Sequence, residues 1–175
     1  MSYIKKFLTF NSIFLVSLII CFAITSATII RERTDFSGIW VINLKKSEFK
    51  EIPIYAAFNR LKVDQKIDSI TLNGFNTGEN NENISEVVTY ALNGKSFERI
   101  TSDNRKLITN LYWSDDERSL KKIGIYSFDD NQQKEEYKRT EVWGLLNNDS
   151  ILTIDITVAY KTGYEYSIKA AYDKQ

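Results

Sequence analysis

The chain has 175 residues, 23 basic and 23 acidic side chains, no histidine and a single cysteine, Cys21. Its length predicts one domain, and its even charge gives no indication of nucleic-acid binding, so we expect no nucleic-acid partner. The lack of histidine, with Cys21 inside an apolar N-terminal run, excludes Ser-His-Asp and Cys-His nucleophiles and thiolate metal sites from the rest of the chain. We therefore expect a non-enzymatic protein without a cofactor, although carboxylates and tyrosines still offer acid–base chemistry.

The N-terminal segment has the layout of a secretory signal peptide. Lys5 and Lys6 are followed by an uncharged run, residues 7–30, and Thr25-Ser26-Ala27 provides the small residues of a cleavage site after Ala27. Two alternatives remain: residues 7–30 as an uncleaved anchor across a bilayer core of about 30 Å, or a lipid on Cys21. All three place a domain of residues 28–175 in the periplasm or outside the cell, with membrane contact only through the N-terminal segment.

The first strands follow from period-2 alternation of apolar residues. In residues 38–44, Trp40, Ile42 and Leu44 share one face. Residues 45–55 read as a connection with a short helix near residues 47–49. Residues 58–65 then form a hairpin with a strand that begins at Ile70.

Turn signals divide the middle of the chain. Residues 73–83 contain two glycines and several asparagines, which predicts a loop. Asn93-Gly94 lies between apparent strands at residues 84–92 and 96–100. Both residue types tolerate positive φ, so we expect a type I′ hairpin that pairs these two strands.

The rest of the chain is also strand-like, with polar turns between alternating segments. The predicted strands are residues 106–113, 120–128, 135–146, 151–160 and 164–172.

This pattern predicts an all-β fold of about ten short strands. Hairpin-length turns, without helical crossovers, exclude a parallel sheet. A long antiparallel meander leaves its edges unprotected unless the sheet curls shut. We therefore predict an antiparallel up-and-down barrel of about 8–10 strands, with a two-sheet β-sandwich as the alternative.

Several short motifs resemble a known family. Phe36-Ser37-Gly38-Ile39-Trp40 resembles the Gly-x-Trp signature that opens the first strand of lipocalins and other calycins. Residues 35–49, 61–65, 90–95 and 143–154 are similar to exported lipocalin-like bacterial proteins of unknown function. The resemblance covers most of the chain after the leader. It implies an antiparallel barrel with Trp40 capping one end and a late arginine packed over it. The resemblance does not identify a ligand.

Arg139 is the leading candidate for a ligand contact. By alternation it shares a face with Tyr137, Glu141 and Trp143. If that face is interior, Arg139 would hold a ligand carboxylate, because a guanidinium binds carboxylates through two parallel hydrogen bonds. The alternative is a solvated arginine paired with Glu141 or with an acid on a neighbouring strand.

Aromatic side chains supply the other candidates. Trp40 would form a pocket floor or serve only as a core aromatic, and the late tyrosines would line a cavity or pair across strands. The candidate ligand-binding residues are Trp40, Tyr137, Arg139, Trp143, Tyr164 and Tyr166. We expect no catalytic and no metal-binding residues, since the acidic turns lack the spacing of a calcium loop.

These patterns lead to two functional hypotheses. The first is an exported barrel that binds a small apolar or amphipathic ligand in the cell envelope. The second is a structural or interaction barrel without a ligand cavity, whose partner would be an envelope protein. An interior cavity, or small residues on the inward faces, would favour the first hypothesis.

Overall fold

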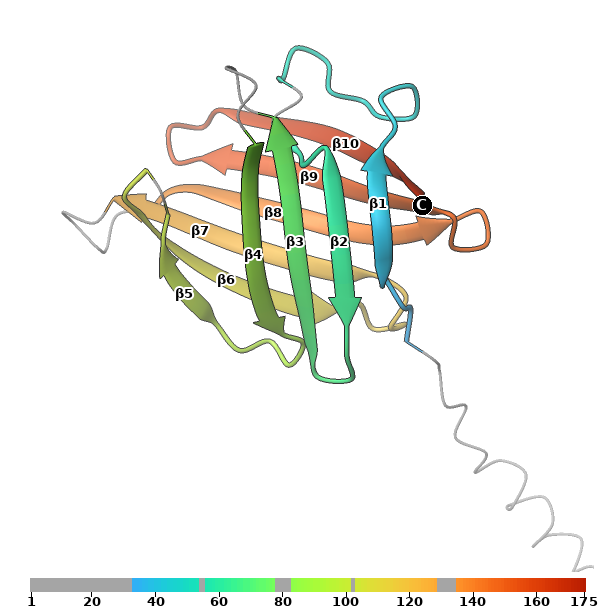
Figure 1. Cartoon of the computed structure of the whole chain (residues 1–175). Helices are drawn as coiled ribbons and strands as arrows, with labels where there is room; N and C mark the ends of the chain where they lie inside the picture. Colours follow the sequence, from blue (N-terminus) through green and yellow to red (C-terminus); the bar gives the residue numbers. More distant parts are fainter. Residues whose placement is uncertain (1–32, 54–55, 78–82, 102, 129–134) are drawn as a thin grey trace, which may run out of the picture. The chain divides into compact units, whose positions relative to one another are not determined.

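A computed structural model describes residues 33–53, 56–77, 83–101, 103–128 and 135–175, which are coloured in Figure 1. Arg33–Gln175 form a compact unit. The leader, with its expected cleavage site and the alternative anchor, lies outside the described residues. Among the described residues, none belongs to a helix of the length and apolarity needed to cross a bilayer.

Ten strands form a single antiparallel sheet in up-and-down order. They are β1 (Gly38–Ile42), β2 (Arg60–Gln65), β3 (Ser69–Thr77), β4 (Asn83–Ala91), β5 (Phe97–Ile100), β6 (Arg105–Trp113), β7 (Leu120–Phe128), β8 (Glu135–Leu146), β9 (Ile151–Tyr160) and β10 (Glu165–Lys174). The sheet order is β4-β3-β2-β1-β10-β9-β8-β7-β6-β5. The predicted all-β antiparallel barrel is confirmed, and the two-sheet sandwich is excluded because β1 pairs with both β2 and β10.

The barrel is nearly closed, and the gap lies between β4 and β5. These strands are the two ends of the sheet order, and no backbone ladder joins them among the described residues. Figure 1 shows β2–β4 crossing in front of β7–β9 at a steep angle, with β5 beside β4. Side chains bridge this gap: the Tyr90 and Phe97 rings meet edge to face at 5.5 Å, and Arg99 forms an ion pair with Glu86. We call this gap the β4–β5 seam.

The predicted Asn93-Gly94 hairpin is wrong. Gly94 has a positive φ of 75°, but β4 pairs with β3 and β5 pairs with β6. Contacts from elsewhere redirect the chain: the Leu92 amide donates to the Asp68 carbonyl at 2.8 Å, and the Asn110 side-chain amide donates to the Gly94 carbonyl at 2.9 Å. Tertiary hydrogen bonds therefore override a strong local turn signal.

Two further local predictions need correction. The expected loop at residues 73–83 is strand as far as Thr77, and β4 begins at Asn83. Gly74 in β3 is a packing position, since a Cβ there would lie 2.7 Å from the Phe58 ring. The expected helix near residues 47–49 is extended instead, because the Glu48 backbone forms an antiparallel bridge with Lys169.

One end of the barrel is closed by aromatic side chains. Trp40 is fully buried, and its indole N–H donates to the Phe36 carbonyl at 2.9 Å. The Phe36 ring lies 6.1 Å from both Trp113 and Trp143. The resemblance implies an arginine over Trp40, and the structure has a lysine there instead: Lys174 Nζ lies 5.1 Å from the ring centroid. This packing places Trp40 in the core of the closed end.

We predict that Trp40→Ala lowers the free energy of unfolding by about 3–5 kcal/mol, because it removes a fully buried ring and leaves a cavity. Urea titration monitored by far-ultraviolet circular dichroism measures the change. Ile67→Ala is the matched control, since Ile67 is 90% exposed and its loss should cost less than about 0.5 kcal/mol. Equal costs for the two variants would contradict the assignment of Trp40 to the core.

Candidate functional site

A cavity of about 200 Å³ lies inside the barrel, beneath the β4–β5 seam. Its wall combines strands on both sides of the seam with the segment that precedes β2. The residues that line it include Phe58, Leu72, Gly74, Glu86, Val88, Tyr90, Arg99, Leu107, Lys122, Tyr126, Arg139 and Glu141, with Ala56 and Ala57. Charged side chains are rare in a barrel interior, and here five of them face one cavity.

The centre of the charged group is Glu141 in β8. Its side chain is only 6% exposed. Lys122 Nζ and Arg139 Nε donate to Oε1 at 3.0 and 2.8 Å, and the Trp143 indole N–H donates to Oε2 at 3.1 Å. Pairing of β7 with β8 places Lys122 directly opposite Glu141, and alternation places Arg139 on the same inward face. We call Lys122, Arg139 and Glu141 the ionic triad.

The ionic triad is charged at neutral pH. Burial alone would raise the pKa of Glu141, but the positive charges of Lys122 and Arg139 outweigh it and hold this pKa at about 2. Burial likewise acts to lower the pKa values of Lys122 and Arg139, and the Glu141 carboxylate outweighs it and raises both. Each cation therefore depends on the Glu141 carboxylate, and the carboxylate depends on both cations.

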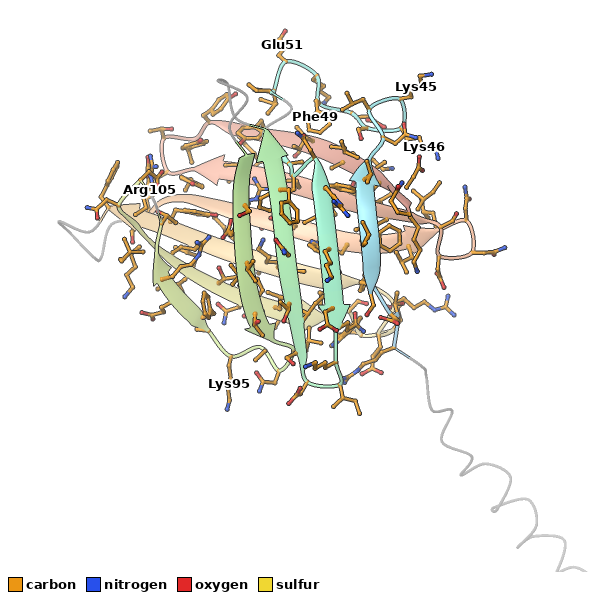
Figure 2. All side chains as sticks on the ribbon, viewed as in Figure 1. Lys45, Lys46, Phe49, Glu51, Lys95 and Arg105 are labelled. Carbon is orange, nitrogen blue, oxygen red and sulfur yellow. The ribbon has the colours of Figure 1, made fainter. Side chains whose placement is uncertain are left out.

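The ionic triad also holds the segment before β2. Arg139 Nη2 donates to the Ala56 carbonyl at 3.1 Å. Two residues later, Phe58 lies against Gly74, where a Cβ would meet the ring. Figure 2 shows Phe49, earlier in this connection, turned toward the barrel, whereas Glu51 projects away from it. Arg139 and Gly74 thus seat Ala56–Phe58 over the cavity.

A second ion pair lies at the β4–β5 seam. Arg99 in β5 pairs with Glu86 in β4, and their side chains are 29% and 33% exposed. Arg99 Nε is buried and has no hydrogen-bond partner among the described residues. Next to this pair, Lys122 Nζ lies 5.7 Å from the ring centroid of Tyr90, whose pKa is raised by burial. The seam pair is therefore more open to solvent than the triad.

A row of tyrosines crosses β7 to β10 at the end of the barrel opposite Trp40. The ring centroids of Tyr126 and Tyr137 are 4.3 Å apart, and those of Tyr137 and Tyr160 are 5.2 Å apart. Tyr164 and Tyr166 continue the row at 5.8 and 6.1 Å. Arg105 Cζ lies 5.9 Å from the Tyr137 ring centroid and is labelled at the edge of the barrel in Figure 2. Only Tyr126 of this row lines the cavity described above.

The structure distributes the predicted site residues over three places. Arg139 lies in the cavity wall and is paired with Glu141. Trp40 and Trp143 lie on the side of the closed end, and Tyr137, Tyr164 and Tyr166 belong to the tyrosine row, where Tyr164 is 59% exposed. The six candidates therefore do not share one pocket wall.

Sequence reasoning missed Glu86, Arg99, Lys122 and Tyr126. A usable signal existed for Glu86, which alternates with Val88 and Tyr90 on one face. Lys122 follows another lysine, so alternation alone does not show which of the two points inward. Arg99 lies in a four-residue strand that is too short to show a clear period.

Comparisons with known proteins do not assign a family. No family model matches the chain, and no curated protein sequence matches it. Among the described residues, no group of three or more His, Cys, Asp and Glu side chains is arranged to hold a metal ion. The functional evidence therefore lies in the cavity and its charged residues.

We predict that Glu141→Gln lowers the free energy of unfolding by about 3–5 kcal/mol, because Lys122 and Arg139 would keep buried charges without a counter-ion. Chemical denaturation at pH 7 measures the change. Glu98→Gln is the control, since Glu98 pairs with Lys106 at 3.0 Å but is 55% exposed and should contribute less than about 1 kcal/mol. Similar losses for both variants would contradict a buried triad.

We predict that acid destabilises the protein between about pH 4.5 and pH 2. The pKa of Glu141 is about 2 in the folded chain against an ordinary 4.5, so the unfolded chain binds this proton more readily. Its stabilising contribution is therefore present above pH 4.5 and is lost as the pH falls toward 2. Unfolding free energies of the wild type and Glu141→Gln, measured across this range, should converge at low pH. Parallel curves would contradict the lowered pKa.

Proposed function

We propose that this barrel is a non-enzymatic binding protein for a small amphipathic ligand held in the interior cavity. The observation that carries the proposal is a cavity in which charged side chains and an apolar wall face the same space. Leu72, Val88 and Leu107 supply the apolar wall, and the seam pair and ionic triad supply the polar part. Small-molecule sites combine these features: a mostly apolar wall and a few placed polar groups.

The size of the cavity restricts the ligand. Its volume of about 200 Å³ is that of roughly six or seven water molecules in the liquid. Pockets that hold drug-sized molecules have volumes of roughly 300–1,000 Å³. The proposed ligand is therefore a short amphipathic molecule, whose buried apolar surface would contribute about 25 cal/mol per Å².

The compartment and family belong to the same proposal. The signal-peptide layout of residues 1–27 supports export to the periplasm or the cell exterior, with anchoring through residues 7–30 or a lipid on Cys21 as alternatives. The Gly-x-Trp motif, with Trp40 buried at the closed end, supports a lipocalin-like origin. An envelope location would bring the barrel close to lipids and their breakdown products.

The rival function is a structural or protein-interaction barrel without a ligand. The internal pairing of the ionic triad favours it, because Glu141 accepts from three side chains without any ligand. The two functions differ in one observable property. Only the binding barrel takes up a small molecule, and its uptake is lost when the cavity beneath the seam is filled.

We predict that Val88→Trp abolishes uptake of short amphipathic molecules, because Val88 lines the cavity and an indole would fill it. Val87→Trp is the matched control, since the adjacent side chain is 64% exposed on the outer face and should leave uptake unchanged. Native mass spectrometry of the full-length chain, recovered from a bacterial envelope and exposed to decanoate and decanol, measures the bound fraction. The mass of the recovered chain also reports whether the leader is cleaved.

Near-ultraviolet circular dichroism would confirm that both tryptophan variants keep their tertiary packing. Failure of the wild type to take up either probe, and recovery without a bound molecule of lipid size, would reject the binding function. A protein partner captured through the outer surface would then become the function to pursue.

A further inference from the structure

We propose that the ligand is a monoanion with a carboxylate head group, and that Arg99 at the β4–β5 seam recognises it by exchanging Glu86 for the ligand. This inference rests on the proposed binding function and names the chemical class of its ligand. It begins with the balance of charge around the cavity. Three cationic side chains line it, and two anionic ones, which leaves one positive charge without a counter-charge (3 − 2 = 1).

The ionic triad does not supply the cationic group that would bind the ligand, because its hydrogen bonds are already made within the protein. Glu141 engages Lys122 and Arg139 through one oxygen and Trp143 through the other. Arg139 uses a further donor on the Ala56 carbonyl. The triad is 6% to 21% exposed at its side chains, so an incoming anion meets it last. The donor that is free to bind a ligand therefore belongs to another residue.

Arg99 has that donor. Its guanidinium carries five N–H donors in a planar fork. Nη2 bonds the Glu86 carboxylate, while Nε is buried without a partner in the described part of the chain. A carboxylate binds a guanidinium through two parallel hydrogen bonds, which would use the edge that Nε occupies. An unpaired buried donor is costly, so a ligand that satisfies it gains affinity.

The position of Arg99 also suits ligand entry. Arg99 and Glu86 lie on opposite sides of the seam, where no ladder hydrogen bonds close the sheet among the described residues, and both side chains are about one-third exposed. An anion entering here meets Arg99 first, with Val88 and Leu107 behind it for an apolar tail. With the displaced Glu86 carboxylate still at the seam, a bound monoanion brings the five charged side chains and the ligand to neutrality.

Charge also separates the alternatives. A cationic ligand would raise the excess to two positive charges inside a space of low dielectric, which is unfavourable. A phosphate dianion would reverse the excess to one negative charge. A neutral alcohol could accept one hydrogen bond, but it would leave the positive charge without a counter-charge. A carboxylate is therefore the head group that the cavity fits.

The test compares decanoate with decanol, which share a ten-carbon chain and differ in the head group. Isothermal titration on the full-length wild type should give decanoate at least tenfold tighter binding than decanol. Arg99→Gln should weaken decanoate by about tenfold, as expected for loss of a charge-assisted hydrogen bond, and should leave decanol within about threefold. Arg118→Gln, an exposed arginine in the β6–β7 turn, is the control and should change neither.

Glu86→Gln provides the opposite test. It removes the internal competitor of the ligand for Arg99, so decanoate should bind several-fold tighter than in the wild type. A purely structural ion pair would give equal or weaker binding in this variant, and that result would overturn the proposal. If decanoate and decanol bind equally well, the proposed carboxylate head group is wrong, but the binding function is still supported. Binding of neither would reject the binding function itself.

Discussion

The buried carboxylate of Glu141 is the interaction on which the interior of this barrel depends. Moving an ionised carboxylate from water into the protein interior costs several kcal/mol unless nearby cations compensate its charge. Lys122 from β7 and Arg139 from β8 meet this requirement, and the Trp143 indole saturates the second oxygen. The same arginine reaches the Ala56 carbonyl. A single buried charge thus links two neighbouring strands to the segment that leads into β2.

This charge also fixes the register of the sheet. A shift of one residue between β7 and β8 would move Lys122 to the outer face and take it away from Glu141, because successive side chains point to opposite sides. At the closed end, Trp40 and Phe36 fix the barrel by apolar packing instead. The molecule therefore combines a close-packed aromatic end with a charged interior around a cavity, and its chemistry is concentrated in the second part.

Period-2 alternation of apolar residues was enough to predict most of the strands, because nearly every strand has one buried face. Leu152, Ile154, Ile156 and Val158 are buried in β9, as alternation requires. Local signals failed where distant residues set the backbone: Asn110 captures the Gly94 carbonyl, and the Phe58 ring occupies the space above Gly74. The site was less predictable. Arg139 could be suspected, whereas the role of Lys122 depends on its register with Glu141, which no local pattern contains.

The β4–β5 seam is the place where the charged interior can be reached from solvent at the lowest cost. Where neighbouring strands are paired, opening the wall would break a ladder of backbone hydrogen bonds. Between β4 and β5, the described contacts are instead the ion pair of Arg99 with Glu86 and the edge-to-face rings of Tyr90 and Phe97. A partly exposed ion pair contributes little to stability, so its replacement by a ligand carboxylate would cost little. In the proposed exchange, a small anion would reach the interior by replacing one side chain, while the register supported by Glu141 and the closed end around Trp40 would stay intact.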